Sequence, residues 1–171
     1  MSSDTSQTTG MYNFWRPLLA IINFGALLWY GAGLMKLTAE LWDFIFVVVG
    51  CYFSLKFAQY LVKAQRFKQT RIRPADMDEF PSKGIYAKIR QPVAAAMIYM
   101  NLAYACFYRS FAMIPAVAIC IAFWYILARY EDQLMLSLFG EEYGEYMKTT
   151  AMIRGGSDEQ QRLVSSGYDM Y

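Results

Sequence analysis

The stretch that decides the fold runs from Lys83 to Ile153, and it begins with the basic loop KGIYAKIRQP at residues 83–92. Two apolar runs follow at 92–108 and 110–128, and only Arg109 separates them. So short a connection predicts an antiparallel helical hairpin. Charged and aromatic residues return after the second run, which puts polar signals at both mouths of the hairpin. We therefore expect a site at a membrane surface.

The composition of the whole chain is that of a membrane protein. Of its 171 residues, 57% are hydrophobic and 18% are charged, whereas soluble domains are about 45–50% apolar and about 25% charged. The apolar residues fall in long blocks, as they do in membrane-spanning helices. The 14 Tyr and 4 Trp are residues that favour membrane interfaces. These features predict an all-α polytopic membrane protein of one domain.

Four transmembrane helices can be drawn along the chain. After a polar N-terminal tail at 1–16, the first covers 17–35 and the second 41–62. The two arms of the hairpin are the third and fourth, and spans of this length suit a hydrocarbon core of about 30 Å. Thr38 is a candidate N-cap for the second helix, and Pro115 is a candidate kink in the fourth.

Few residues inside the apolar blocks carry chemistry. Asn101 is the clearest polar residue there, and we expect it to hydrogen-bond across helices. The cysteines Cys51, Cys106 and Cys120 have no metal-binding spacing and are typical of small buried residues. Histidine is absent, so the chain lacks the commonest metal ligand and the usual neutral-pH acid or base. We expect neither a metal site nor a Ser-His-Asp hydrolase.

The basic residues predict an orientation. With four spans, both termini share one side of the membrane with the loop at 63–91. That side holds Arg16, Lys63, Arg66, Lys68, Arg71, Arg73, Lys83, Lys88, Arg90, Arg129, Lys148, Arg154 and Arg162. The opposite side holds only Lys36 and Arg109. By the positive-inside rule the heavy side is cytoplasmic, or matrix or stromal in an organelle. The mitochondrial inner membrane and the endoplasmic reticulum both fit.

Two basic features leave alternatives open. Lys56, late in the second span, either extends its ammonium group to the interface or forms a buried ion pair with a carboxylate or ligand. The basic run at 63–73 either lies solvated against anionic lipid headgroups or binds an acidic partner or nucleotide. Pro74 and Pro81 exclude one long helix through this loop.

The segment after the fourth span stays amphipathic without spanning the membrane. Residues 131–138 look helical, and Gly140 can end that helix in a left-handed conformation. A further interfacial helix follows, with one face toward protein or lipid, and a polar tail covers 155–171. The residues on that face are Tyr143, Tyr146, Met147 and Thr150.

The order of these signals resembles the isoprenylcysteine carboxyl methyltransferases and the related phospholipid methyltransferases. Gly84-Ile85-Tyr86 matches the Gly-x-Tyr loop of that family, and Arg90-Gln91-Pro92 half-matches its Arg-His-Pro-x-Tyr-x-Gly turn. Glu131-Asp132 stands where the family has a Glu-Glu pair. Residues 139–146 match its Phe-Gly-x-x-Tyr-x-x-Tyr stretch in full. The resemblance covers 83–153, which is less than half of the chain.

The resemblance implies S-adenosylmethionine as the cofactor. Glu131 and Asp132 would bind its hydroxyl and ammonium groups, and Tyr86, Arg90 and Gln91 would complete the pocket. Arg90 would also be placed to steer a carboxylate substrate. The sulfonium is already a strong electrophile, so methyl transfer asks the protein mainly for alignment and desolvation. No catalytic acid or base is nominated.

Three departures fall in the turn that holds the cofactor in that family. Gln91 replaces the His, Ala94 the Tyr and Ala96 the Gly. Gln91 can still donate and accept hydrogen bonds, but it does not titrate. Ala94 offers neither a hydroxyl nor a ring, and Ala96 adds a methyl group where close backbone approach favours glycine. In the acidic pair, Asp132 is shorter than the Glu that it replaces.

Two functions therefore stay open. In the first, the chain is a catalytically degenerate relative that serves as an accessory subunit of a larger membrane complex, for example an organellar energy-transducing complex. In the second, it is an active S-adenosylmethionine-dependent methyltransferase whose substrate is membrane-embedded, such as a prenylcysteine carboxylate or a phospholipid amine. The expected partners are the bilayer, protein subunits and a bound lipid, and no nucleic acid.

Overall fold

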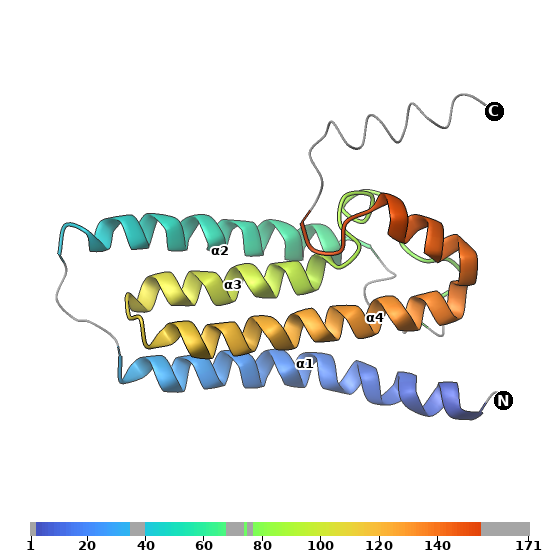
Figure 1. The fold of residues 1–171 in the computed structure, drawn as a ribbon, viewed down its shortest axis with the longest axis horizontal. Coiled ribbons are helices and arrows are strands. Elements are labelled where there is room, and N and C mark those ends of the chain that lie inside the picture. The colour runs from blue at the N-terminus through green and yellow to red at the C-terminus, as the bar shows by residue number, and fades with distance from the viewer. Residues whose placement is uncertain (1–2, 35–39, 68–73, 75–76, 155–171) are drawn as a thin grey trace, which may run out of the picture.

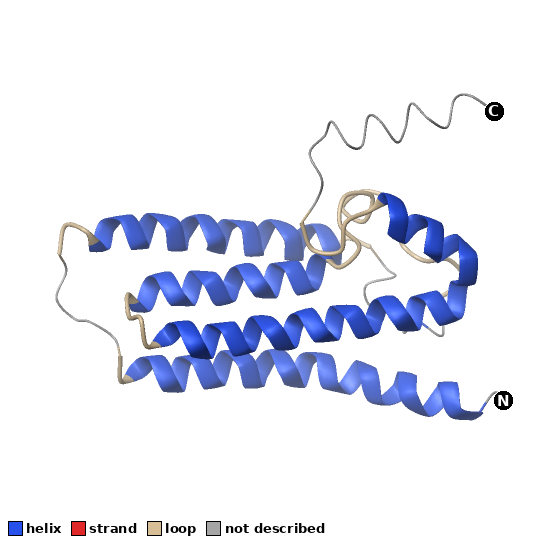
Figure 2. Ribbon diagram, viewed as in Figure 1, coloured by secondary structure: helices blue, strands red, loops and turns tan. Residues whose placement is uncertain are grey.

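The chain folds as a bundle of four helices in the computed structural model, which describes residues 3–34, 40–67, 74 and 77–154 (Figure 1). The helices are α1 (Ser3–Ala32), α2 (Asp43–Gln65), α3 (Pro92–Tyr108) and α4 (Met113–Thr149). The described residues contain no strand (Figure 2). The all-α fold class predicted from the sequence is confirmed.

Each helix in the bundle runs antiparallel to the helix before it in the chain. In Figure 1, α3 lies between α2 and α4, and α1 lies along the other side of α4. The bounds of α3 are those that the sequence predicted. The start predicted for the first helix at Pro17 is wrong, because α1 already begins at Ser3. A helix can pass through a proline at the loss of one hydrogen bond, so Pro17 did not mark its start.

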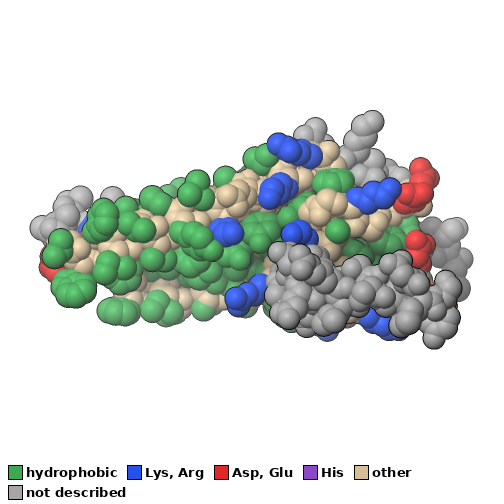
Figure 3. All heavy atoms as spheres, turned by 90° about the horizontal axis from the view of Figure 1, so that it is seen from above, with side chains coloured by type: hydrophobic (Ala, Val, Ile, Leu, Met, Phe, Trp, Pro, Cys, Tyr) green, Lys and Arg blue, Asp and Glu red, His purple; other side chains and the backbone are tan. Residues whose placement is uncertain are grey.

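Two of the helices, α2 and α4, are long and apolar enough to cross a membrane, each through an apolar stretch of 18 residues. Only 6% of this stretch in α2 and 22% in α4 is buried inside the bundle. The core helix of a soluble protein would be mostly buried. Figure 3, viewed from the α2 side, shows hydrophobic side chains exposed over much of this surface. The apolar part of α1 (Leu18–Ala32) and the whole of α3 are shorter than 18 residues. The structure therefore supports two candidate membrane spans.

The hairpin between α3 and α4 is closed by Arg109. This residue adopts a left-handed conformation (φ 51°, ψ 32°) at the end of α3, and its backbone N–H donates to the Cys106 carbonyl at 3.2 Å. Its guanidinium forms a 2.8 Å ion pair with Asp43 in the first turn of α2. The predicted hairpin is confirmed, and one end of it is fixed to α2. Thr38 lies outside the described residues.

The break in α4 falls at Gly140 and not at Pro115. Pro115 lies in the first turn of α4, where its missing N–H costs no helical hydrogen bond, so the predicted kink there is wrong. Gly140 has φ 59° and ψ −134°, a conformation open essentially to glycine alone. After it the helix resumes and folds back toward the end of α2 (Figure 1). We call the returning part, 141–149, the C-terminal arm.

A polar cluster lies inside the bundle and links three helices. The Asn23 side chain of α1 donates to Asn101 Oδ1 of α3 at 2.8 Å, and Trp124 Nε1 of α4 donates to Asn23 Oδ1 at 3.2 Å. All three side chains are buried. The cross-helix role predicted for Asn101 is confirmed, and such bonds favour one packing of apolar helices over another.

Candidate functional site

The basic loop at 83–92 is held between α2 and the end of α4. Gly84 has a positive φ of 64°, which glycine adopts without steric cost. The loop then pairs with the segment after α4, since Ile89 forms a parallel bridge with Ala151 and Arg90 N–H donates to the Ala151 carbonyl at 2.9 Å. This backbone pairing delivers the Arg90 and Gln91 side chains to the corner enclosed by α4 and the C-terminal arm.

At that corner Asp132 accepts four hydrogen bonds. Arg90 donates to Oδ2 through Nε at 3.3 Å and through Nη2 at 2.9 Å. Oδ1 accepts from Gln91 Nε2 at 3.2 Å and from the Tyr143 hydroxyl at 2.9 Å. The Arg90 and Asp132 side chains are only 9% and 3% exposed. We call these four side chains, from Arg90, Gln91, Asp132 and Tyr143, the Asp132 network.

Arg90 also holds the end of the C-terminal arm. Its Nη1 donates to the Met147 carbonyl at 2.7 Å and to the Thr150 carbonyl. A cation is favourable there, because the last carbonyls of a helix lack partners and its dipole is negative at that end. The Tyr146 hydroxyl donates to the Tyr86 carbonyl, which joins the arm to the basic loop a second time.

Glu131 is buried beside Asp132, beyond the apolar part of α4 that ends at Ala128. Burial, and then the negative charge of Asp132, raise the pKa of Glu131 to about 8, so this carboxyl is mostly protonated at neutral pH. Burial raises the pKa of Tyr143 and of Tyr146 as well. These hydroxyls therefore stay protonated and act as hydrogen-bond donors.

The structure brings the nominated cofactor residues to one corner of the molecule. Arg90, Gln91 and Asp132 are in direct contact, Glu131 is next to Asp132, and Tyr86 is joined through Tyr146. The sequence placed Tyr143 on a packing face and missed its bond to Asp132. Its place in the tyrosine motif was the signal, but the contact depends on the turn at Gly140.

The hydrogen-bond acceptor positions of Asp132 are all occupied by groups of the protein itself. An ionised carboxylate has about four acceptor positions, and those of Asp132 are taken by Arg90, Gln91 and Tyr143. Arg90 donates to Asp132 and to the Met147 and Thr150 carbonyls through four of its five N–H groups. A ligand could bind Asp132 only after one of these hydrogen bonds had broken. As it stands, the network joins the loop, α4 and the arm.

The altered positions of the turn are part of a packed helix start. Pro92 is the first residue of α3, and Ala94 and Ala96 are 3% and 0% exposed. Ala94 packs in a cluster with Met97, Trp124 and Ala128. A tyrosine ring at position 94 would have to displace the α4 side chains that now fill this space.

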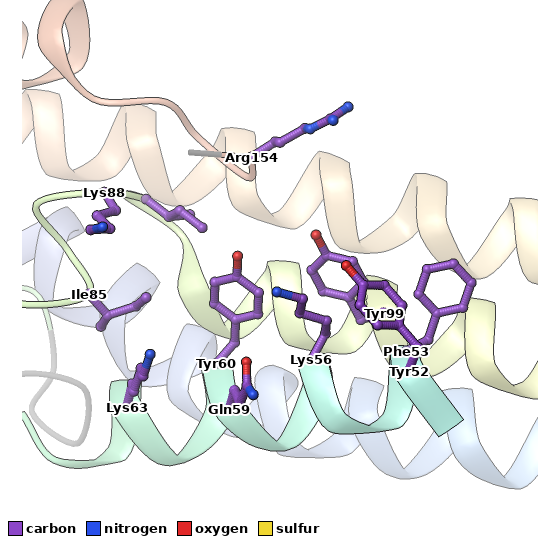
Figure 4. Close-up of a pocket in the computed structure, with 11 residues that line it drawn as sticks. Tyr52, Phe53, Lys56, Gln59, Tyr60, Lys63, Ile85, Lys88, Tyr99 and Arg154 are labelled. Carbon is purple, nitrogen blue, oxygen red and sulfur yellow. The ribbon is translucent and has the colours of Figure 1, made fainter. Parts of the chain in front are cut away.

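A cavity beside the loop is lined by Ile89 and lies between α2, α3 and the basic loop (Figure 4). Its volume is about 570 Å³. Its lining residues are Tyr52, Phe53, Lys56, Gln59, Tyr60, Lys63, Ile85, Lys88, Ile89, Tyr99 and Arg154. The lining contains basic side chains and no carboxylate. S-adenosylmethionine carries a net positive charge, so this cavity suits it poorly.

No family model, curated protein or solved structure matches the chain. The likeness to the membrane methyltransferases therefore rests on the motifs at Tyr86, Arg90, Glu131 and Phe139.

Proposed function

We propose that this chain is an integral membrane subunit in which a methyltransferase-like site has become structural. It serves as an accessory subunit of a larger membrane complex and is not a catalyst. The observation that carries the proposal is the saturation of Asp132 by Arg90, Gln91 and Tyr143. A carboxylate that must bind cofactor hydroxyls needs free acceptor positions, and the fold itself uses those of Asp132.

The proposal places all four helices across the bilayer. Because α2 and α4 run in the same direction (Figure 1), a chain in which both cross must return through the membrane between them. Among the described residues between α2 and α4, only α3 (Pro92–Tyr108) runs from the end of α2 back to the start of α4. Its 17 residues span about 25 Å at 1.5 Å per residue, close to the hydrocarbon thickness.

The charges supply the orientation of the proposed subunit. The loop at 63–91 and the end of α4 hold most of the Lys and Arg, whereas the hairpin turn holds Arg109, which is paired with Asp43. The positive-inside rule then puts the termini on the cytoplasmic side, or on the matrix or stromal side in an organelle. The endoplasmic reticulum and the mitochondrial inner membrane are the membranes proposed.

The alternative is an active S-adenosylmethionine-dependent methyltransferase with a prenylcysteine carboxylate or a phospholipid amine as its substrate. In its favour, Glu131 and Asp132 lie beside Arg90 and Gln91, in the order that the family motifs imply. For this function the Arg90–Asp132 ion pair would have to open and release a carboxylate to the cofactor.

Calorimetric titration of S-adenosylmethionine into the full chain in detergent micelles separates the two functions. The proposed subunit gives no saturable heat up to about 1 mM cofactor, and its circular dichroism shows that it is folded. Saturable binding that is lost in Glu131→Ala, but kept in the exposed control Glu145→Ala, would support the enzyme and overturn the proposal.

A further inference from the structure

The cavity between α2 and α3 is built by a repeating face of α2. Tyr52, Lys56, Tyr60 and Lys63 recur at intervals of three and four residues, so they lie on one side of that helix. Figure 4 shows them directed toward the basic loop and α3, with Lys63 and Lys88 at the Ile85 end. Arg154 stands at the rim with its guanidinium directed outward.

Aromatic rings form one wall of this cavity. Tyr60 and Tyr99 are stacked with centroids 5.4 Å apart and planes 5° apart. Phe53 stacks on Tyr99 at 6.1 Å, and Lys56 Nζ lies 5.5 Å from the centre of the Tyr52 ring. These rings give the wall apolar carbon atoms and, from the tyrosines, hydroxyl groups. Such a wall suits the glycerol region of a lipid, which is apolar on one side and polar on the other.

The charge of the cavity has one sign. Lys56, Lys63, Lys88 and Arg154 line it, and none of its lining residues is acidic. Basic side chains that converge on a concave surface raise the local concentration of anions, and lysine is a common phosphate binder. A volume of about 570 Å³ lies within the usual range of ligand sites, roughly 300–1,000 Å³.

The position of the cavity indicates where the anion comes from. The first part of α2 exposes large apolar side chains, among them Phe44, Ile45 and Val48. Figure 3 shows Lys and Arg side chains gathered toward the other end of the bundle, which is where lipid headgroups would lie. Tyrosine and lysine at such a boundary are typical of the membrane interface. The cavity therefore opens at headgroup depth.

We propose that this cavity binds the phosphate group of an anionic phospholipid, with Lys56, Lys63 and Lys88 around the phosphate and Tyr60 and Tyr99 against the glycerol. The inference rests on the membrane placement proposed above, but not on the question of the cofactor. It also assigns a common role to Lys56 and to Lys63 of the basic run, whose roles the sequence left open, since both would bind the same lipid.

The test uses the full chain in detergent micelles, titrated with phosphatidylglycerol or phosphatidylcholine and followed by native mass spectrometry. Phosphatidylglycerol is expected to bind saturably, and phosphatidylcholine at least about 10-fold more weakly. Glycerol phosphate in solution provides the separate arm for a free phosphate source. Equal binding of both lipids overturns the proposal, and glycerol phosphate binding as tightly as the lipid overturns the lipid as source.

Matched variants separate the cavity from general surface charge. K56Q/K63Q is expected to weaken phosphatidylglycerol binding by roughly 10- to 30-fold. R66Q/K83Q removes the same charge from residues outside the cavity lining and is expected to change binding by less than about 3-fold. Equal loss in the two pairs overturns the proposal. If K56Q/K63Q does not fold, K56M decides, because it keeps the aliphatic stem and removes only the charge.

Discussion

At the scale of single residues, the chemistry of this molecule is concentrated on Asp132 and its neighbour Glu131. These two adjacent carboxyl groups are both buried, but they differ in their surroundings. Asp132 is paired with Arg90, whereas Glu131 is held mainly in its protonated form by burial and by the charge of Asp132. The cost of two buried negative charges is avoided in this way.

The raised pKa of Glu131 makes folding stability depend on pH. The folded chain keeps this proton up to about pH 8, whereas the unfolded chain releases it near its ordinary pKa of 4.5. Stability from this group is therefore complete below pH 4.5 and is lost as the pH rises through 8, by an amount on the order of 5 kcal/mol. The thermal midpoint of the wild type should fall between about pH 5 and pH 9.

Glu131→Gln is the control for this pH dependence. The amide cannot ionise, so the variant should lose most of the fall in midpoint while Asp132 and Arg90 keep their pairing. A variant whose midpoint falls as steeply as that of the wild type would show that other groups cause the loss.

The sequence identified these site residues through their motifs, but it could not identify their state. Arg90, Gln91 and Asp132 were nominated together, and they do lie in contact. That they would bind one another, and not a ligand, depends on Tyr143 and on the Met147 and Thr150 carbonyls. Those groups arrive only through long-range folding, which no local pattern records.

At the scale of elements, Gly140 decides whether α4 is one straight helix or a helix with a returning arm. Its φ of 59° with ψ of −134° is closed to other residues. We expect Gly140→Ala to destabilise the fold by about 1–3 kcal/mol, because the arm carries Tyr143 to Asp132. Unfolding in detergent micelles measures this loss.

Gly144→Ala is the matched control within the same arm. Gly144 is helical, and a methyl group there would meet only Leu136 at an ordinary 3.7 Å. This change should be neutral or stabilising by up to about 1 kcal/mol, as alanine favours helices over glycine. Equal destabilisation by the two changes would contradict a special role for Gly140.

The bounds of a helix could be predicted from the sequence where residues that favour a helix start or a turn stand at its ends. Pro92 and Arg109 bound α3 as predicted, because a proline suits a helix start and a turn follows at Arg109. Residues 131–138 were predicted to be helical, but the sequence did not indicate that this helix continues the fourth span without a break, since charged residues follow Ala128. The lysine cavity could not be predicted, because Lys88 is brought beside Lys56 and Lys63 only by the packing of the basic loop on α2.

At the scale of the whole molecule, the proposed four-span topology is open to a direct labelling test. Ser82 lies in the loop before α3, and Ser110 lies in the hairpin turn after it. In a chain whose Cys51, Cys106 and Cys120 are replaced by alanine, Ser82→Cys and Ser110→Cys should react with an impermeant maleimide from opposite sides of sealed vesicles. Labelling from the same side would mean that α3 does not cross.

The central claim, that the Asp132 network is structural, is tested most directly by the unfolding free energies of the wild type, Arg90→Ala, Asp132→Ala and the double variant in detergent micelles. Each single change leaves a buried charge without its partner, so each should cost about 3–5 kcal/mol. The double variant should cost little more than one of them, which gives a coupling energy of at least about 2 kcal/mol. Single losses below about 1 kcal/mol that simply add would contradict the claim.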